Sequence, residues 1–243
     1  MALWHEIVHN PEAIAKNYER LWKEQQGNER KFYDHVRNEF NKTKQPEYLL
    51  YLLARCVKAS VRYNPKGEFN QSPDNRRLGR EPKKMADDIF TVSNLLRSRI
   101  KITSKDYKDI LETATPDDLV YMDPPYQGVC SNGDPRYYGS VDFDELMQAL
   151  SQLNHRSGSF ILSYDGRTGN KSFGKELPRS LELHRIEIEA GRSTQSTLLG
   201  GDAVTFESIY ISKALVERLD IPPRKLADKL AAQRTAQLAF LIL

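Results

Sequence analysis

The chain has 243 residues, of which 39% are hydrophobic and 28% charged, and its formal net charge is +3. These values describe a folded protein able to bury a sizeable core, and they exclude a disordered chain. No apolar stretch approaches the roughly 20 residues that a membrane-spanning helix needs, and the first residues show no signal-peptide pattern. Cys56 and Cys130 are the only cysteines, which excludes a disulfide scaffold and a cysteine-rich zinc site. We expect a cytoplasmic protein without a metal centre.

The first third of the chain is predicted to be helical. Asn10-Pro11-Glu12 is typical of a helix start, because a capping residue precedes a proline and an acid. The apolar positions that follow recur at spacings of three and four residues, and the pattern returns from Phe32 to Phe40. A nearly buried helix is expected from Glu47 to Val57.

A long loop is predicted from Asn64 to Pro82, where prolines and glycines accumulate. Loops of this length in compact domains are often functional. Between Arg55 and Lys84 there are nine basic residues and three acids, a local excess of +6. Such a patch suits a polyphosphate partner, because phosphate contacts release condensed counterions. The alternative is a solvated surface loop without a partner.

From about Ile100 the pattern changes to alternating strands and helices. We expect strands over Arg99 to Thr103, Leu119 to Met122, Ser159 to Tyr164, Leu181 to Glu189 and Phe206 to Ile211. Helices are expected over Lys105 to Glu112 and Asp142 to Leu153, and the tail after Ile221-Pro222-Pro223 is expected to form one amphipathic helix. This alternation predicts an α/β fold with a mainly parallel sheet and helices on its faces.

The most informative motif is Asp123-Pro124-Pro125-Tyr126, directly after a predicted strand. Two consecutive prolines cannot continue a β-ladder or a helix interior, so the chain has to turn there. The turn places Asp123, the two prolyl carbonyls and the Tyr126 ring at the carboxyl end of a strand, where open α/β sheets bind ligands. The alternative is a tight structural turn with an exposed acid and a packed tyrosine.

This arrangement suits the methylation of an exocyclic amine. The adenine amine is a poor nucleophile, because its lone pair is delocalised into the ring. A carboxylate and a prolyl carbonyl can accept hydrogen bonds from its two N–H groups. These bonds favour a pyramidal nitrogen and stabilise the positive charge that develops on it. The tyrosine ring would stack on the base, which has to be flipped out of the duplex to be reached. The methyl donor would be S-adenosylmethionine.

With this motif the chain resembles the Dam and phage Dam type of DNA adenine methyltransferases. The segment from Arg62 to Asn70 resembles the family's Arg-Tyr-Asn-x-x-Gly-Glu-Phe-Asn sequence, which belongs to its DNA-recognition domain. Arg37 to Asn41 is similar to an earlier Glu-Phe-Asn stretch of the family. Further similarities are the strand-end motif Ser163-Tyr164-Asp165 and the late motif formed by Arg192-Ser193-Thr194 with Phe206 to Tyr210.

The resemblance implies a Rossmann-like S-adenosylmethionine-dependent methyltransferase sheet with a helical target-recognition domain. Residues 1–97 would recognise double-stranded DNA, residues 98–213 would catalyse the reaction, and residues 214–243 would form a C-terminal helical tail. The implied catalytic residues are Asp123, Pro124, Pro125 and Tyr126, and the implied cofactor contacts are Asp106 and Asp123. The expected DNA contacts are Arg62, Tyr63, Asn64, Lys66, Arg76, Arg77 and Arg192. For Asp106 an ordinary helix-start acid is the alternative.

The chain departs from the family in its cofactor elements. The family holds its cofactor with a Gly-rich loop after the first strand and an acid after the second, and neither pattern is found in these residues. We therefore expect an incomplete sheet, completed by a separate chain or by a longer protein that includes this one. Gln71 to Asn75 differs from the usual Dam continuation, which leaves the recognition sequence open.

Three functional interpretations follow. The first is a site-specific DNA adenine methyltransferase of a restriction-modification or Dam-like system. The second is an inactive DNA-binding remnant, or one half of a split enzyme. The third is methylation of an RNA or protein amine, against which the segment from Arg62 to Asn70 argues.

Overall fold

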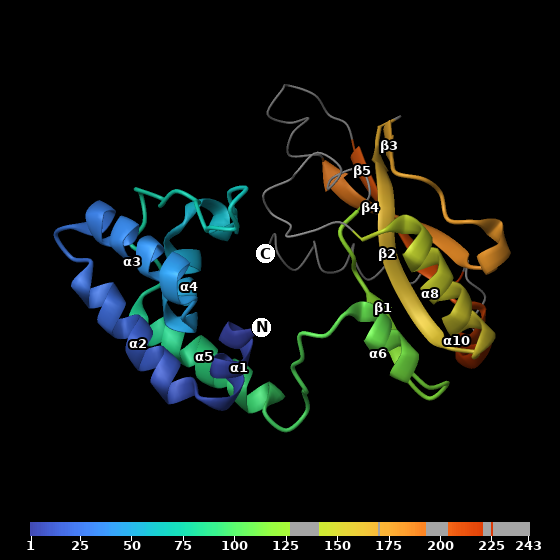
Figure 1. Cartoon of the computed structure of the whole chain (residues 1–243), viewed down its shortest axis with the longest axis horizontal. Coiled ribbons are helices and arrows are strands. Elements are labelled where there is room, and N and C mark those ends of the chain that lie inside the picture. The colour runs from blue at the N-terminus through green and yellow to red at the C-terminus, as the bar shows by residue number, and fades with distance from the viewer. Residues whose placement is uncertain (127–140, 170, 193–203, 221–224, 226–243) are drawn as a thin grey trace. The chain divides into compact units, whose positions relative to one another are not determined.

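The computed structural model describes residues 1–126, 141–169, 171–192, 204–220 and 225. They divide into two compact units, residues 1–104 and the described residues from 105 onward, each with a core of its own (Figure 1). The helices of the first unit are α1 (Ala2–His9), α2 (Pro11–Glu24), α3 (Glu29–Thr43), α4 (Pro46–Arg55), the 3-10 turn η1 (Val57–Ala59) and α5 (Pro82–Leu96). The predicted helical first third is confirmed.

The helices of the first unit form where the sequence pattern predicts them. α2 begins at Pro11 and buries Ile14, Tyr18 and Leu21 along one face. Asn10 precedes it but does not cap it, because its amide donates to Glu6 instead. α4 ends at Arg55, two residues before the predicted end, because the backbone is extended from the next residue.

A long loop, residues 60–81, connects η1 to α5 as predicted. It contains isolated β-bridges but no regular strand; the bridges join Cys56 to Pro73 and Tyr63 to Phe69. α5 closes the unit: its buried Ser93 donates a 2.7 Å hydrogen bond to the carbonyl of Val8 at the end of α1. The loop is therefore framed on both sides by packed helices.

The second unit is built on a sheet of order β1-β2-β5-β4, with β3 paired to β2. Its strands are β1 (Leu119–Met122), β2 (Ser159–Thr168), β3 (Lys171–Phe173), β4 (His184–Arg192) and β5 (Val204–Ile211). Among the described strands only β1 and β2 are parallel, so the prediction of a mainly parallel sheet is wrong for this part. β5 pairs antiparallel with both β2 and β4, and β3 pairs antiparallel with β2, because the alternation of strands and helices in a sequence does not fix the direction of each strand.

Helices cover both faces of this sheet. On one face α6 (Tyr107–Thr113) and α8 (Phe143–His155) pack on β2, so that Leu111, Leu150 and Phe160 share one core (Figure 1). On the other face α10 (Lys213–Leu219) packs on a cluster that contains Ile211 and Leu215. A further 3-10 turn, η2 (Arg179–Leu181), precedes β4. The α/β class is confirmed, and none of the described helices is both long and apolar enough to span a membrane.

Two expectations need comment. The strand predicted from Arg99 to Thr103 is wrong: this segment is an irregular connection without a β partner, and Ile100 is exposed. The amphipathic tail helix lies outside the described residues, apart from residue 225. Within the described part, β1 is paired only along the edge that faces β2, and Leu119 and Tyr121 are 57% and 65% exposed.

Candidate functional site

The Asp-Pro-Pro-Tyr turn leaves the sheet at the carboxyl end of β1. Met122, the last residue of β1, lies beside Leu162 of the parallel strand β2, so the turn emerges next to the carboxyl half of β2. Asp123 is exposed, and the two prolines are half-buried. The structure thus brings the predicted catalytic residues to the sheet edge where ligands bind in α/β proteins.

Tyr126 is held by two neighbouring residues of β2. Its hydroxyl forms a 2.8 Å hydrogen bond with the Oγ atom of Ser163. Its ring meets the ring of Tyr164 edge to face, with centroids 6.3 Å apart and an interplanar angle of 81°. Burial raises the pKa of the Tyr126 phenol, and the Ser163 hydrogen bond opposes this shift only in part. The ring therefore remains a neutral phenol in a fixed position.

An irregularity of β2 supports this arrangement. The pairing of β2 with β5 shifts between Ser163 and Gly166, and Asp165 adopts a left-handed backbone with φ of 54°. A side chain at Gly166 would come within 2.5 Å of the Phe206 carbonyl, so only glycine fits there. Asp165 is buried, accepts a 2.6 Å hydrogen bond from Tyr210, and has its pKa raised by burial. The bulge thus fixes the segment that carries Ser163 and Tyr164.

Asp106, the predicted cofactor contact, lies at the start of α6. Its carboxylate accepts a 2.9 Å hydrogen bond from the backbone N–H of Lys108, which is the geometry of a helix N-cap. This bond accounts for the residue type at this position, as the alternative interpretation predicted. A contact with a cofactor stays a proposal.

The described residues match a cofactor site in part. Asp106 and Asp123 supply carboxylates that could accept hydrogen bonds from ribose hydroxyls or an amine. A close backbone approach to the methionine end of S-adenosylmethionine favours a glycine in a turn between a strand and the following helix. No glycine occupies such a turn in the part of the chain that the structure describes.

The long loop of the first unit is anchored by side chains from three helices. Each of these side chains bonds to backbone atoms of the loop rather than to its side chains. The bonds are Tyr18 to the Arg80 carbonyl (2.6 Å), Gln25 to the Leu78 carbonyl (3.0 Å), Tyr33 to the Gln71 carbonyl (2.9 Å) and Arg55 to the Asp74 carbonyl (3.1 Å). Asn41 binds Phe69 twice, at the N–H (2.7 Å) and at the carbonyl (3.0 Å). The loop therefore has a defined backbone before any partner binds.

Two of the predicted DNA contacts shape the loop itself. The side-chain oxygen of Asn64 accepts from the backbone N–H groups of Lys66 and Glu68, both at 3.0 Å, and its amide donates to the Glu68 carboxylate. The Tyr63 ring packs edge to face on Phe69, 6.2 Å between centroids, and burial raises its pKa. Both side chains are thus engaged inside the unit.

The other predicted DNA contacts of the first unit are exposed cations. Arg62 and Lys66 lie on the surface of the loop, and Arg76 and Arg77 are exposed but paired with Asp74. Arg192 belongs to β4, in the second unit, and its side chain lies outside the described residues. The first unit thus presents four of the predicted arginines and lysines to solvent.

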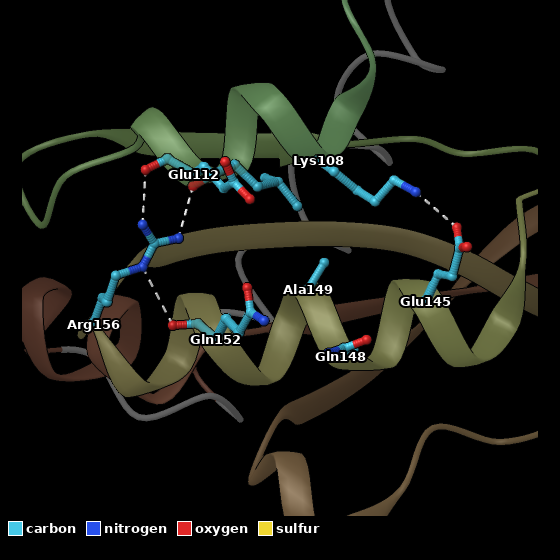
Figure 2. A pocket seen from close by; sticks show the side chains of 8 residues that line it. Lys108, Glu112, Glu145, Gln148, Ala149, Gln152 and Arg156 are labelled. Atoms are coloured by element: carbon cyan, nitrogen blue, oxygen red, sulfur yellow. Dashed lines mark hydrogen bonds and ion pairs between the residues drawn. The ribbon is translucent and has the colours of Figure 1, made fainter.

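A pocket of about 190 Å³ lies between α6 and α8 (Figure 2). At one end Lys108 forms a 2.9 Å ion pair with Glu145. At the other end Arg156 donates to the carbonyls of Leu111 and Glu112, both at 2.8 Å, and so caps the end of α6. The Lys108–Glu145 pair and the Arg156 hydrogen bonds join the two helices to each other, so these charged groups serve the packing of α6 on α8.

Two residues of the candidate sites were not predicted. Ser163 is part of the strand-end motif, and its position in β2, the strand parallel to β1, brings its hydroxyl to the tetrad. Asp74 was counted only as an acid in a basic patch, and its signal was the pair of arginines two and three residues later. Neither contact can be read from the residue types alone.

A parallel strand followed by Asp-Pro-Pro-Tyr, in a chain that also carries a helical unit with a basic loop, is typical of amine methyltransferases that act on nucleic acid. A family model described as D12 class N6 adenine-specific DNA methyltransferase matches residues 1–194. The chain therefore belongs to the D12 class of N6 adenine-specific DNA methyltransferases. The interpretation as an inactive DNA-binding remnant or half of a split enzyme is not favoured, and neither is that as an RNA or protein methyltransferase.

Similar proteins carry matching names. The type II methyltransferase M1.LlaDCHI of Lactococcus lactis subsp. cremoris is 23% identical over 212 residues, which cover 81% of this chain and 71% of that protein. The DNA adenine methylase of Serratia marcescens is 26% identical over 200 residues, which cover 79% and 70%. The DNA N-6-adenine-methyltransferase of Escherichia phage P1 is 26% identical over 136 residues, which cover 52% of this chain and 18% of that protein.

Proposed function

We propose that this chain carries the catalytic and DNA-recognition parts of an enzyme that methylates the exocyclic amine of an adenine flipped out of double-stranded DNA, with S-adenosylmethionine as methyl donor. The observation that carries the proposal is the tetrad at the carboxyl end of β1, with Tyr126 hydrogen-bonded to Ser163 of the neighbouring parallel strand. A cytoplasmic location and a place in a restriction-modification or Dam-like system belong to the same proposal.

The tetrad acts on the amine through its acceptors. The Asp123 carboxylate and the Pro124 carbonyl accept hydrogen bonds from the two N–H groups of the amine. These bonds favour a pyramidal nitrogen and stabilise its developing positive charge. Pro125 fixes the turn, and the Tyr126 ring stacks on the extruded base. S-adenosylmethionine, when bound, would supply an electrophilic methyl group for the amine nitrogen. Asp106 and Asp123 are our candidates to contact it.

DNA binding is assigned to the long loop and its neighbours. Arg62, Lys66, Arg76 and Arg77 are exposed cations on a loop whose backbone is anchored from within, and such cations suit phosphate and base-edge contacts. Tyr63 and Asn64 give this surface its shape through the contacts described above. Arg192 remains a proposed contact to the substrate strand.

The test is the substitution Asp123→Ala in an active preparation. Because Asp123 acts on the amine and not on the phosphates, methyl transfer should be abolished while the Kd for duplex DNA stays within about twofold. The matched control is Asp117→Ala, which removes another exposed acid close to β1. Methyl transfer into DNA and fluorescence anisotropy give the two readouts. A fall in DNA affinity as large as the fall in rate would show that Asp123 is structural.

A further inference from the structure

The basic patch of the first unit contains an acid with unusual surroundings. The Asp74 side chain is only 5% exposed, although it lies in the long loop. Its backbone N–H donates to the Arg55 carbonyl at 2.8 Å, and its own carbonyl accepts from Arg55 Nη1 at 3.1 Å. Since Arg55 is the buried last residue of α4, the carboxylate of Asp74 is fixed to the helical framework.

Two arginines converge on this carboxylate from the solvent side. Arg76 donates from Nε and Nη2 at 3.2 and 3.4 Å, and its backbone N–H donates at 3.0 Å. Arg77 donates from Nε and Nη2 at 3.0 and 2.8 Å. Their side chains are 84% and 67% exposed. The hydrogen bonds from Arg76 and then Arg77 hold the pKa of Asp74 well below its usual range, so the carboxylate stays charged.

This arrangement differs from the ordinary surface pairs of the same unit. In Arg20–Glu24 and Arg80–Asp88 both partners are exposed, and such pairs contribute little to stability. Here one covered carboxylate serves two exposed guanidinium groups and leaves a net charge of +1 at the surface. The buried carboxylate therefore holds both guanidinium groups in a fixed orientation at the surface.

The geometry of arginine indicates which N–H donors of Arg76 and Arg77 remain available to a partner. A guanidinium group carries five N–H donors in one plane. Asp74 engages Nε and Nη2 of each arginine, and in the described part of the chain Nη1 of neither arginine donates to another residue. A planar edge of each group is therefore available to a partner with two coplanar acceptors.

We propose that Asp74 is a positioning residue that fixes Arg76 and Arg77 as a paired set of bidentate donors for DNA. The chemistry they recognise is a pair of adjacent acceptors, either two phosphate oxygens or the N7 and O6 atoms of guanine. The inference rests on the proposed function, in which the long loop contacts DNA.

The test is the substitution Asp74→Asn, for which electrostatics alone and the positioning role predict opposite changes in the Kd for DNA. Asp74→Asn removes a negative charge close to DNA, so electrostatics alone predicts tighter binding. If Asp74 positions the arginines, the Kd for a mixed-sequence duplex of about 25 base pairs rises instead, by about fivefold or more. Asp87→Asn is the matched control, because Asp87 is an exposed acid of α5 and the charge change is the same. We expect no rise in Kd for this control.

A second variant guards against a change in fold. Arg76→Lys with Arg77→Lys keeps Asp74 and both positive charges but removes the planar donor edges. We expect this double variant to lose as much affinity as Asp74→Asn while its thermal melting transition stays cooperative. Binding as tight as that of wild type, for either the double variant or Asp74→Asn, overturns the proposal.

A comparison of duplexes identifies the source of the acceptors. Equal losses on a mixed-sequence duplex and on a duplex of A·T pairs alone assign the contact to phosphates, and a loss confined to the mixed duplex assigns it to guanine. Arg76→Ala with Arg77→Ala separates this inference from the proposed function. If that variant leaves affinity and its salt dependence unchanged, the loop is not the DNA site. If it weakens binding while Asp74→Asn does not, only the positioning role fails.

Discussion

Ser163 makes the polar contact of β2 with the tetrad, since its Oγ holds the Tyr126 hydroxyl at 2.8 Å. Stacking on a flipped base requires a ring whose plane is already set, because ordering it at the moment of binding costs conformational entropy. Two features set that plane, the Ser163 hydrogen bond and the Tyr164 ring. Only the first can be removed without changing the packing volume much.

We therefore expect Ser163→Ala to lower kcat by about fivefold, with little change in the KM for DNA, because one hydrogen bond contributes about 1 kcal/mol. Ser163→Thr should restore most of the rate, since it keeps the hydroxyl. Ser151→Ala on α8 is the control for loss of a serine hydroxyl. Steady-state kinetics and the emission of a 2-aminopurine placed at the target adenine provide the measurements. An equal loss of rate in the threonine variant would argue against the hydrogen bond.

At this scale the sequence predicted the residues of the tetrad but not their partners. Asp-Pro-Pro-Tyr after an apolar strand fixes a local turn, and local geometry follows from proline chemistry. The contact between Tyr126 and Ser163 joins residues 37 positions apart, so it depends on which strand lies beside β1. For Asp106 the residue type did not distinguish two roles, because an aspartate suits both a helix N-cap and a cofactor contact. The structure shows the N-cap.

At the scale of elements, Asn41 joins the helix α3 to the long loop. It lies on α3 and binds both backbone atoms of Phe69, 28 residues further along the chain. The Phe69 side chain is buried and packs edge to face on Phe40, the neighbour of Asn41, with centroids 6.0 Å apart. Asn41 and Phe40 of α3 thus hold the middle of the loop with polar and aromatic contacts to one residue.

Asn41→Ala should reduce the free energy of unfolding by about 1–3 kcal/mol, because the N–H and carbonyl of Phe69 lose their partner. Hydrogen exchange at the Phe69 amide should accelerate more than exchange within α3, since the anchor is local to the loop. Asn38→Ala, an exposed position on the same helix, is the control. Urea unfolding and exchange monitored by NMR supply the readouts. Unchanged exchange at Phe69 would contradict the anchoring role.

The elements themselves were largely predictable. Helical periodicity located α2 and α3, and apolar runs located β1 and β2, because these patterns reflect the face that each element buries. Two predictions failed for tertiary reasons. Residues 99–103 have strand-like composition but pair with no described strand, and the direction of β5 depends on the strands that lie beside it rather than on its composition.

The molecule as a whole has one feature that bears on its cofactor. Of the described strands, only β2 pairs with β1, and the outward residues Leu119 and Tyr121 remain exposed. An unpaired edge with apolar neighbours is a surface for pairing with another strand. We propose that a strand with a glycine-rich turn pairs there and completes the cofactor site.

Accordingly, the 243-residue chain alone should show no saturable heat of S-adenosylmethionine binding in calorimetry. The reason is that methyl transfer needs the cofactor held in a narrow geometry, which carboxylates without a close backbone turn do not provide. DNA binding by the same preparation is the positive control for correct folding. Tight binding of S-adenosylmethionine by this chain alone would contradict the prediction.

The anchoring of the long loop has a consequence for how such proteins diversify. Five residues of the loop are held by bonds from helix side chains to their backbone atoms, namely Phe69, Gln71, Asp74, Leu78 and Arg80. A bond to a carbonyl does not depend on which side chain that residue carries. The exposed side chains of the loop can therefore be exchanged while the path of the chain is kept. If the loop reads DNA as proposed, its target sequence can therefore change through surface substitutions alone, without a new framework.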